Sequence, residues 1–297
     1  MALAAAGAVA FSGKAIIVKL AYRHGVDAVT LIMYRMLFAL PLFAAMAWWA
    51  GRGQPPLSGR DRLGVLGLGF SGYYLASFLD FWGLQYISAS LERLILYLNP
   101  TLVLVLGWLL MGRRIGARQA LGMAVSYAGV LVVFGHEVQL DGTNTLLGGA
   151  LVLGSAISYA VYLLYSGELV QRLGAIRLVG LATSAACGFC LLQFVLLRPW
   201  SAAWVAPEVI GLSLANAVLC TAAPVLMVMM AIERIGSGLA AQVGMVGPMA
   251  TLLMGVWWLD EPFNRWIAAG TLLVLAGVLW ATRPDAAARP PVVAQPD

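Results

Sequence analysis

The sequence predicts an all-α membrane protein whose ten transmembrane helices form two inverted five-helix repeats. Two observations predict this fold. The first is the composition: 62% of the 297 residues are hydrophobic, only 10% are charged and the mean hydropathy is +0.89, whereas about a quarter of a soluble domain is charged. The second is an internal repeat, described below. The composition argues against soluble enzymes, nucleic-acid binders and secreted disulfide scaffolds.

The net charge of +5 fits the basic excess of cytoplasmic membrane loops, and an acidic partner is the alternative. Cys187 and Cys190 form a CxxC, but neither His24 nor His136 lies in their apolar stretches, so we interpret them and Cys220 as packing residues. We expect no cofactor and no metal. The expected partners are a small-molecule substrate and membrane lipid, without nucleic acid or an obligate protein partner.

A helix crosses the hydrocarbon core in about 20 residues. The amino terminus lacks a basic n-region, so we expect a first span there and not a cleaved signal. The alternation typical of a membrane β-barrel is absent from the sequence. Polar and Gly/Pro punctuation divides the chain into ten segments of suitable length: 3–22, 28–50, 62–84, 88–111, 117–135, 146–167, 176–197, 208–231, 237–258 and 264–282.

Arginines orient these segments, because cytoplasmic loops retain Lys and Arg. With the amino terminus inside, four arginines fall at the outer ends: Arg23, Arg93, Arg198 and Arg265. Eleven fall on the cytoplasmic side: Arg52, Arg60, Arg62, Arg113, Arg114, Arg118, Arg172, Arg177, Arg234, Arg283 and Arg289. We therefore expect a bacterial-type inner membrane protein with both termini in the cytoplasm.

The internal repeat appears when the chain is shifted by 148 residues. Without a gap, Pro100 then falls on Pro248, Gly107 on Gly255, and Ala128–Leu131 on Ala276–Leu279. We expect a first repeat at 1–135, a periplasmic connection at 136–145, a second repeat at 146–282 and a cytoplasmic tail at 283–297. An odd number of helices turns the second copy upside down, which is typical of secondary transporters.

Two stretches carry a resemblance to a known family. They are Gly83–Leu96 with the following Pro100-Thr101, and Pro248 with the later Leu259-Asp260-Glu261-Pro262. Together they resemble the EamA-type repeats of the drug/metabolite transporter superfamily, over nearly the whole chain. The resemblance implies ten helices and export of metabolites, including aromatic amino acids. The chain departs from the pattern at Arg113, where the first repeat usually has an acidic residue.

Charged residues inside the spans are costly in hydrocarbon and are therefore functional candidates. At a rise of 1.5 Å per residue, Lys19, Asp80 and Glu92 each lie about 6 Å from the outer boundary and Arg35 about 12 Å from it. In this shared layer we expect a structural network in which Asp80 compensates Arg35 or Lys19. The alternative is an outer gate or a proton-binding carboxylate.

Lys14 lies near the middle of the first span, roughly 13 Å from Arg23. The same depth estimate puts no acidic residue at its level, so we expect Lys14 to lack a permanent partner. It is then suited to bind a cargo carboxylate, or alternatively to snorkel or bind carbonyls in a wet cavity.

Aromatic and amide side chains on the central spans predict a largely apolar cavity with a few polar points, which is the usual form of a small-molecule site. Packing is the alternative for each of them individually. The predicted substrate-binding set is Lys14, Tyr74, Phe78, Phe81, Tyr97, Asn99, Tyr159, Tyr162, Asn216 and Gln242.

Pro100 and Pro248 each remove a backbone donor inside a span and should kink it. Their matched positions make them candidate hinges, with static kinks as the alternative. We find no GxSxG or HExxH motif and predict no catalytic residue.

The leading interpretation is an inner-membrane secondary transporter that exports small metabolites, amino acids above all, by alternating access. A proton-coupled multidrug or cation exporter of the same fold is the first alternative. An intramembrane lipid-modifying enzyme is the second.

Overall fold

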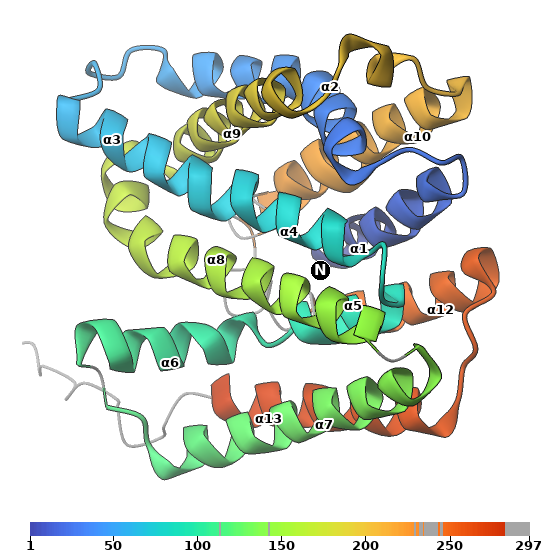
Figure 1. Cartoon of the computed structure of the whole chain (residues 1–297). Coiled ribbons are helices and arrows are strands. Elements are labelled where there is room, and N and C mark those ends of the chain that lie inside the picture. Colours follow the sequence, from blue (N-terminus) through green and yellow to red (C-terminus); the bar gives the residue numbers. More distant parts are fainter. Residues whose placement is uncertain are drawn as a thin grey trace, which may run out of the picture.

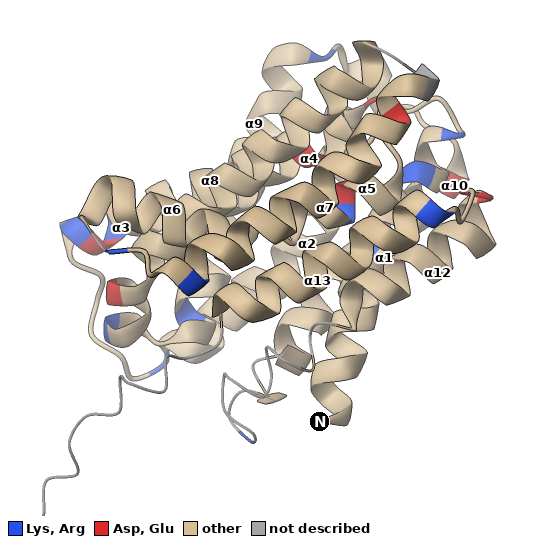
Figure 2. Ribbon diagram, turned by 90° about the horizontal axis from the view of Figure 1, so that it is seen from below, with Lys and Arg blue, Asp and Glu red and all other residues tan. Residues whose placement is uncertain are grey.

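The computed structural model describes residues 1–112, 114–141, 143–228, 230–231, 234, 243 and 246–282. These residues are helical apart from short connections, and none of them is in a strand. Most of the charged residues lie towards the two ends of the helices, and a few lie inside the bundle near α4 and α5 (Figure 2). This is the distribution expected for a chain whose middle lies in hydrocarbon, and the chain is a multi-pass membrane protein.

The first half contains five spans. Three of them are single unbroken helices: α1 (Ala2–Tyr22), α2 (Ala28–Gly51) and α7 (Ala117–Asp141). The third span runs through three successive elements, α3 (Gly59–Leu68), the π-helical η1 (Gly69–Leu75) and α4 (Ala76–Gly83). The fourth consists of α5 (Ala89–Leu96) and α6 (Asn99–Met111).

The second half repeats this order. It begins with α8 (Thr143–Leu173) and α9 (Ala175–Leu197), followed by the short 3₁₀ turn η2 (Trp200–Ala203). The next span joins α10 (Pro207–Ala217) to the π-helical η3 (Val218–Ala222) and reaches Val228. The last two spans end with α12 (Gly247–Leu259) and α13 (Arg265–Thr282).

All ten expected segments coincide with these helices, although only the second half of segment 237–258 belongs to the described residues. Eight of the described spans are long and apolar enough to cross a membrane, and two of these consist of successive elements, α5 with α6 and α10 with η3. The third span is divided by its π-helix, and α12 is the short apolar helix of the ninth. Two boundaries were placed too tightly, because α7 continues to Asp141 and α8 already begins at Thr143.

The packing follows a twofold pattern between the halves. The second spans pair with each other (α2 on α9) and so do the fifth (α7 on α13), as Figure 1 shows at the top and bottom of the molecule. The contacts of α1 with α10 and α12 are matched by those of α8 with α4 and with α5 and α6. The main contacts between the two halves therefore follow the repeat.

Glycines at the matched positions hold α7 and α13 close together. A Cβ on Gly129 would lie 2.7 Å from the carbonyl oxygen of Gly270, and a Cβ on Gly122 would lie 2.7 Å from that of Gly277. The 148-residue shift superimposes Gly122 on Gly270 and Gly129 on Gly277, so the two contacts are related by the repeat. Only glycine permits this approach of the two backbones.

The breaks in the spans are also matched. Shifted by 148 residues, η1 falls on 217–223, which contains η3. The helix is interrupted between Leu96 and Asn99, and both Pro100 and Pro248 lie in the first turn of the helix that follows. There a missing backbone donor costs nothing, because first-turn donors have no partner within the helix. Pro100 thus begins a new helix after an interruption and does not lie inside one, and kinking or hinge motion at either proline stays a prediction.

Candidate functional site

Five charged side chains are buried at the centre of the bundle. They come from four elements: Lys14 from α1, Arg35 from α2, Asp80 from α4, and Glu92 and Arg93 from α5. Each is at most 6% exposed. Ionised groups in such surroundings need partners, since isolated buried charges are strongly unfavourable.

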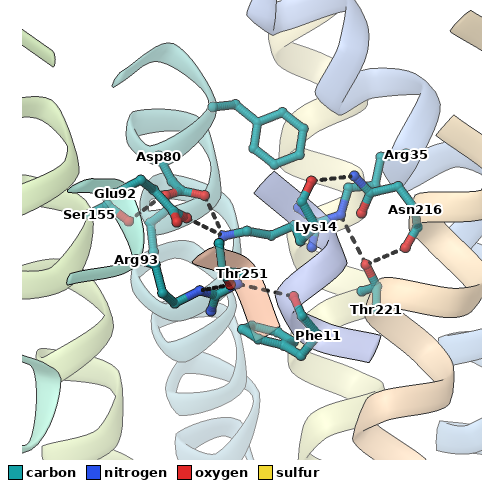
Figure 3. Close-up of polar contacts among 12 residues, drawn as sticks. Phe11, Lys14, Arg35, Asp80, Glu92, Arg93, Ser155, Asn216, Thr221 and Thr251 are labelled. Carbon is teal, nitrogen blue, oxygen red and sulfur yellow. Dashed lines mark hydrogen bonds and ion pairs between the residues drawn. The ribbon is translucent and has the colours of Figure 1, made fainter. Parts of the chain in front are cut away.

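Lys14 has two carboxylate partners. Its Nζ lies 2.5 Å from Asp80 Oδ2 and 3.2 Å from Glu92 Oε1 (Figure 3). The prediction that Lys14 has no acidic partner at its depth was therefore wrong. The depth estimate compared positions along the helices and neglected the reach of the four-carbon lysine side chain, which carries the ammonium towards the carboxylates.

The direct contacts of Arg35 among the described residues are neutral, and the charge of Asp80 acts on it from beyond ion-pair distance. Its Nε donates to Thr221 Oγ1 at 3.1 Å, and Thr221 Oγ1 in turn donates to the carbonyl oxygen of Asn216 at 2.9 Å. The guanidinium lies over the Phe81 ring, 5.1 Å from its centroid. Its Nη1 is buried and has no hydrogen-bond partner in the described part of the chain. The predicted direct partners of Asp80 were wrong, because Asp80 pairs with Lys14, although its charge also acts on Arg35.

Arg93 completes the cluster on the side of α12. Its Nε donates to Thr251 Oγ1 at 3.0 Å and its Nη2 to the carbonyl oxygen of Phe11 at 3.3 Å. Arg93 and Lys14 both approach the Phe11 ring, at 5.5 and 5.7 Å from its centroid. The centre thus contains three basic and two acidic side chains.

A cavity of about 320 Å³ opens beside this cluster. Its wall combines charged, amide and aromatic groups with small residues from both repeats. Of the predicted binding and charge residues, six line it: Lys14, Arg35, Asp80, Tyr97, Asn99 and Tyr159. A volume of this kind, mostly apolar with a few polar groups, matches a site for a small molecule.

Five predicted binding residues lie outside this wall, and Gln242 lies outside the described residues. Tyr74 packs against Phe70 and Phe189, and Phe78 against Trp82. The Tyr162 hydroxyl is 3.2 Å from that of Tyr73, which does line the cavity. The other two are Phe81, beneath Arg35, and Asn216, whose Nδ2 donates to the carbonyl oxygen of Lys14 at 3.5 Å.

A second charge cluster lies at one end of the bundle, at the right in Figure 1, where α5 begins. Glu261 accepts hydrogen bonds from the Ala89 amide at 2.7 Å and the Ser90 hydroxyl at 2.7 Å. Lys19 donates to the carbonyl oxygen of Ile87 at 2.7 Å and lies 3.9 Å from Glu261. The direct contacts of Lys19 therefore lie in this end cluster and include neither Asp80 nor Glu92, although the charge of Glu92 also acts on it.

Sequence reasoning missed several contributors to these clusters, among them Arg93, which it counted only as an outer-end arginine. Glu137 accepts hydrogen bonds from the amide and hydroxyl of Ser88 at the start of α5, but the expected fifth segment ended at 135. Thr221 fixes Arg35, and a threonine in an apolar helix gives no signal of that role. In the described residues no group of three His, Cys, Asp or Glu side chains could hold a metal ion.

Fold and site together define a multi-pass membrane protein with a polar cavity between two repeats. The EamA-like transporter family model matches residues 1–135 and 146–283, so the chain belongs to the EamA-like transporter family. The chain is 31% identical over 272 residues to the uncharacterized transporter YcbK of Bacillus subtilis, covering 86% of this chain and 83% of that protein.

More distant relatives are also similar over nearly the whole chain. An uncharacterized transporter of Archaeoglobus fulgidus is 25% identical over 274 residues, which cover 92% of this chain and 93% of that protein. A solved crystal structure with 18% sequence identity matches the fold with a TM-score of 0.64, covering 94% of this chain and 96% of its own. This last likeness shows the fold.

Proposed function

We propose that this EamA-family protein is an inner-membrane secondary transporter that exports small metabolites by alternating access. Amino acids, and aromatic ones in particular, are the favoured cargo. The observation that carries this proposal is the central cavity, which both repeats line and whose wall joins Tyr97 and Tyr159 to charged side chains. Such a wall can hold an apolar ring and still orient a polar end.

The matched packing of the repeats supports alternating access. If two halves that make matching contacts with each other can exchange their conformations, one sequence pattern produces states open to opposite sides. If both termini lie in the cytoplasm, as we propose, the cluster of Lys19, Glu261 and Ser90 lies at the outer end, while the cavity reaches Ala8 on the cytoplasmic half of α1. We propose that this state faces inward.

A proton-coupled exporter of drugs or cations is the second candidate, and a specific feature favours it. Asp80 and Glu92 share the ammonium of Lys14. Two buried carboxylates beside one ammonium form a group that can exchange a proton during transport. The names of the relatives favour transport over an intramembrane enzyme.

The experiment is release from proteoliposomes loaded with a panel of amino acids or cationic dyes, with and without a pH gradient. Faster release of amino acids than from protein-free liposomes supports the proposal. Release of dyes alone, driven by the gradient, supports the second candidate. Release of neither would contradict both.

A further inference from the structure

Arg35 lines the cavity, and its contacts with Thr221 and Phe81 do not explain why a charged side chain is there. We propose that Arg35 binds a carboxylate of the transported molecule, so that the cargo is a small organic carboxylate. This assignment rests on the proposed transport function and names the cargo group that the central site recognises. It also moves the carboxylate site from Lys14, where we first expected it, to α2.

The charge inventory of the centre supports an anionic group. Lys14, Arg35 and Arg93 contribute three positive charges, and Asp80 and Glu92 contribute two negative ones. Both carboxylates lie at Lys14. One positive charge is therefore in excess at a site shielded from water, and a carboxylate in the cavity would balance it.

The geometry of Arg35 leaves it prepared for a ligand. Thr221 holds Nε, and the Phe81 ring supports one face of the guanidinium. Stacking on a ring leaves the in-plane N–H donors available, and their fork matches the two oxygens of a carboxylate. Nη1 is buried without a hydrogen-bond partner among the described residues. A buried donor of this kind is costly unless something occupies it.

The other two cations are less suitable. Lys14 is occupied by Asp80 and Glu92 (Figure 3), so a cargo carboxylate would compete with two internal ones. Arg93 already donates to Thr251 and to the carbonyl oxygen of Phe11. Arg35 also lines the cavity, so a carboxylate can reach it without breaking an ion pair between described residues.

The test compares binding of L-phenylalanine and of its amide, phenylalaninamide, to the purified full-length protein in detergent. Arg35→Gln should weaken binding of phenylalanine by about ten- to a hundredfold, the effect of losing a hydrogen bond to a charged group. The affinity for phenylalaninamide should change by less than about threefold, which is within the error of such estimates. Arg35→Lys should restore part of the phenylalanine affinity, because charge is kept but the fork is lost.

Arg52→Gln is the matched control, since Arg52 follows the other end of α2 and stacks on Trp48 outside the cavity. It should leave both affinities unchanged. Melting temperatures verify that the variants are folded at the temperature of the binding measurement.

Two results would overturn the assignment: equal losses for the acid and the amide in Arg35→Gln, or no binding of the acid to wild-type protein. Failure of the transport function gives a different result. In that case wild-type proteoliposomes release neither amino acids nor dyes. If only the Arg35 assignment fails, proteoliposomes still release amino acids, and they release the acid and its amide equally well.

Discussion

Lys14 and Arg35 line the same cavity, yet their surroundings differ. The ammonium of Lys14 contacts two carboxylates, whereas the guanidinium of Arg35 contacts a hydroxyl and a ring. A buried charge saturated by the protein contributes to the fold, and one held only by neutral groups remains available for a ligand. The position of a charge in the membrane therefore indicates its role less well than its partners do.

The largest expected effect comes from removing the saturated charge. Lys14→Gln leaves Asp80 and Glu92 facing each other without a cation between them, so it should lower the free energy of unfolding by about 3 to 5 kcal/mol. Thermal unfolding of the purified protein in detergent measures this loss. A melting temperature equal to that of wild type would show that Lys14 is not part of a structural ion cluster.

Asp80→Asn tests the same cluster from its acidic side. It leaves one ammonium with one carboxylate, Glu92, so it should cost less than Lys14→Gln. We expect about 1.5 to 3 kcal/mol, the range for a hydrogen bond to a charged group. In the double variant Lys14→Gln, Asp80→Asn the second change should recover part of the stability, and simple addition of the two losses would argue against coupling.

A smaller effect is expected at the end cluster, where a carboxylate is held mainly by neutral donors. Glu261→Gln keeps one acceptor oxygen for the start of α5 but loses the other and the ion pair with Lys19. By analogy with the loss of a helix cap, the cost should be about 0.5 to 2 kcal/mol. The control is Glu168→Gln on the exposed α8 pair with Arg172, which should change stability by less than about 0.5 kcal/mol. Equal effects of the two variants would contradict the capping role.

The smallest effect concerns Asp27, outside the spans. Partial burial raises the pKa of its carboxyl, but hydrogen bonds from Thr30 and Arg198 together outweigh it and hold the pKa below its usual value. A lowered folded-state pKa adds stability above the usual value of 3.8, and this stability is lost as the pH falls through the folded-state pKa.

Asp27→Asn keeps a good helix cap and removes the titration. Its stability should therefore fall slightly below that of wild type near neutral pH, and the two should converge as the pH drops below 3.8. Thermal unfolding across this range provides the measurement. A difference that grows towards acid has the wrong sign for a lowered pKa.

The fold was predictable because the sequence records it in regular features. Apolar length fixed the spans, and the shift that superimposes Pro100 on Pro248 fixed the repeat. The candidate site was predictable in part: the rarity of charge in the spans identified Lys14, Arg35, Asp80 and Glu92. Their pairing was not, because it depends on side-chain reach and on how the helices turn towards one another.

The most direct test of the account locates the carboxylate in the cavity. Ser77 lines the cavity on α4 and is partly exposed, so a cysteine there, with Cys187, Cys190 and Cys220 replaced by alanine, reports whether the cavity is occupied. We expect L-phenylalanine to slow labelling of Ser77→Cys by a small thiol reagent, and phenylalaninamide to slow it much less. The protection should disappear when Arg35→Gln is added. Labelling that phenylalanine leaves unchanged, or protection that persists without Arg35, would contradict the claim that Arg35 receives the carboxylate of the cargo.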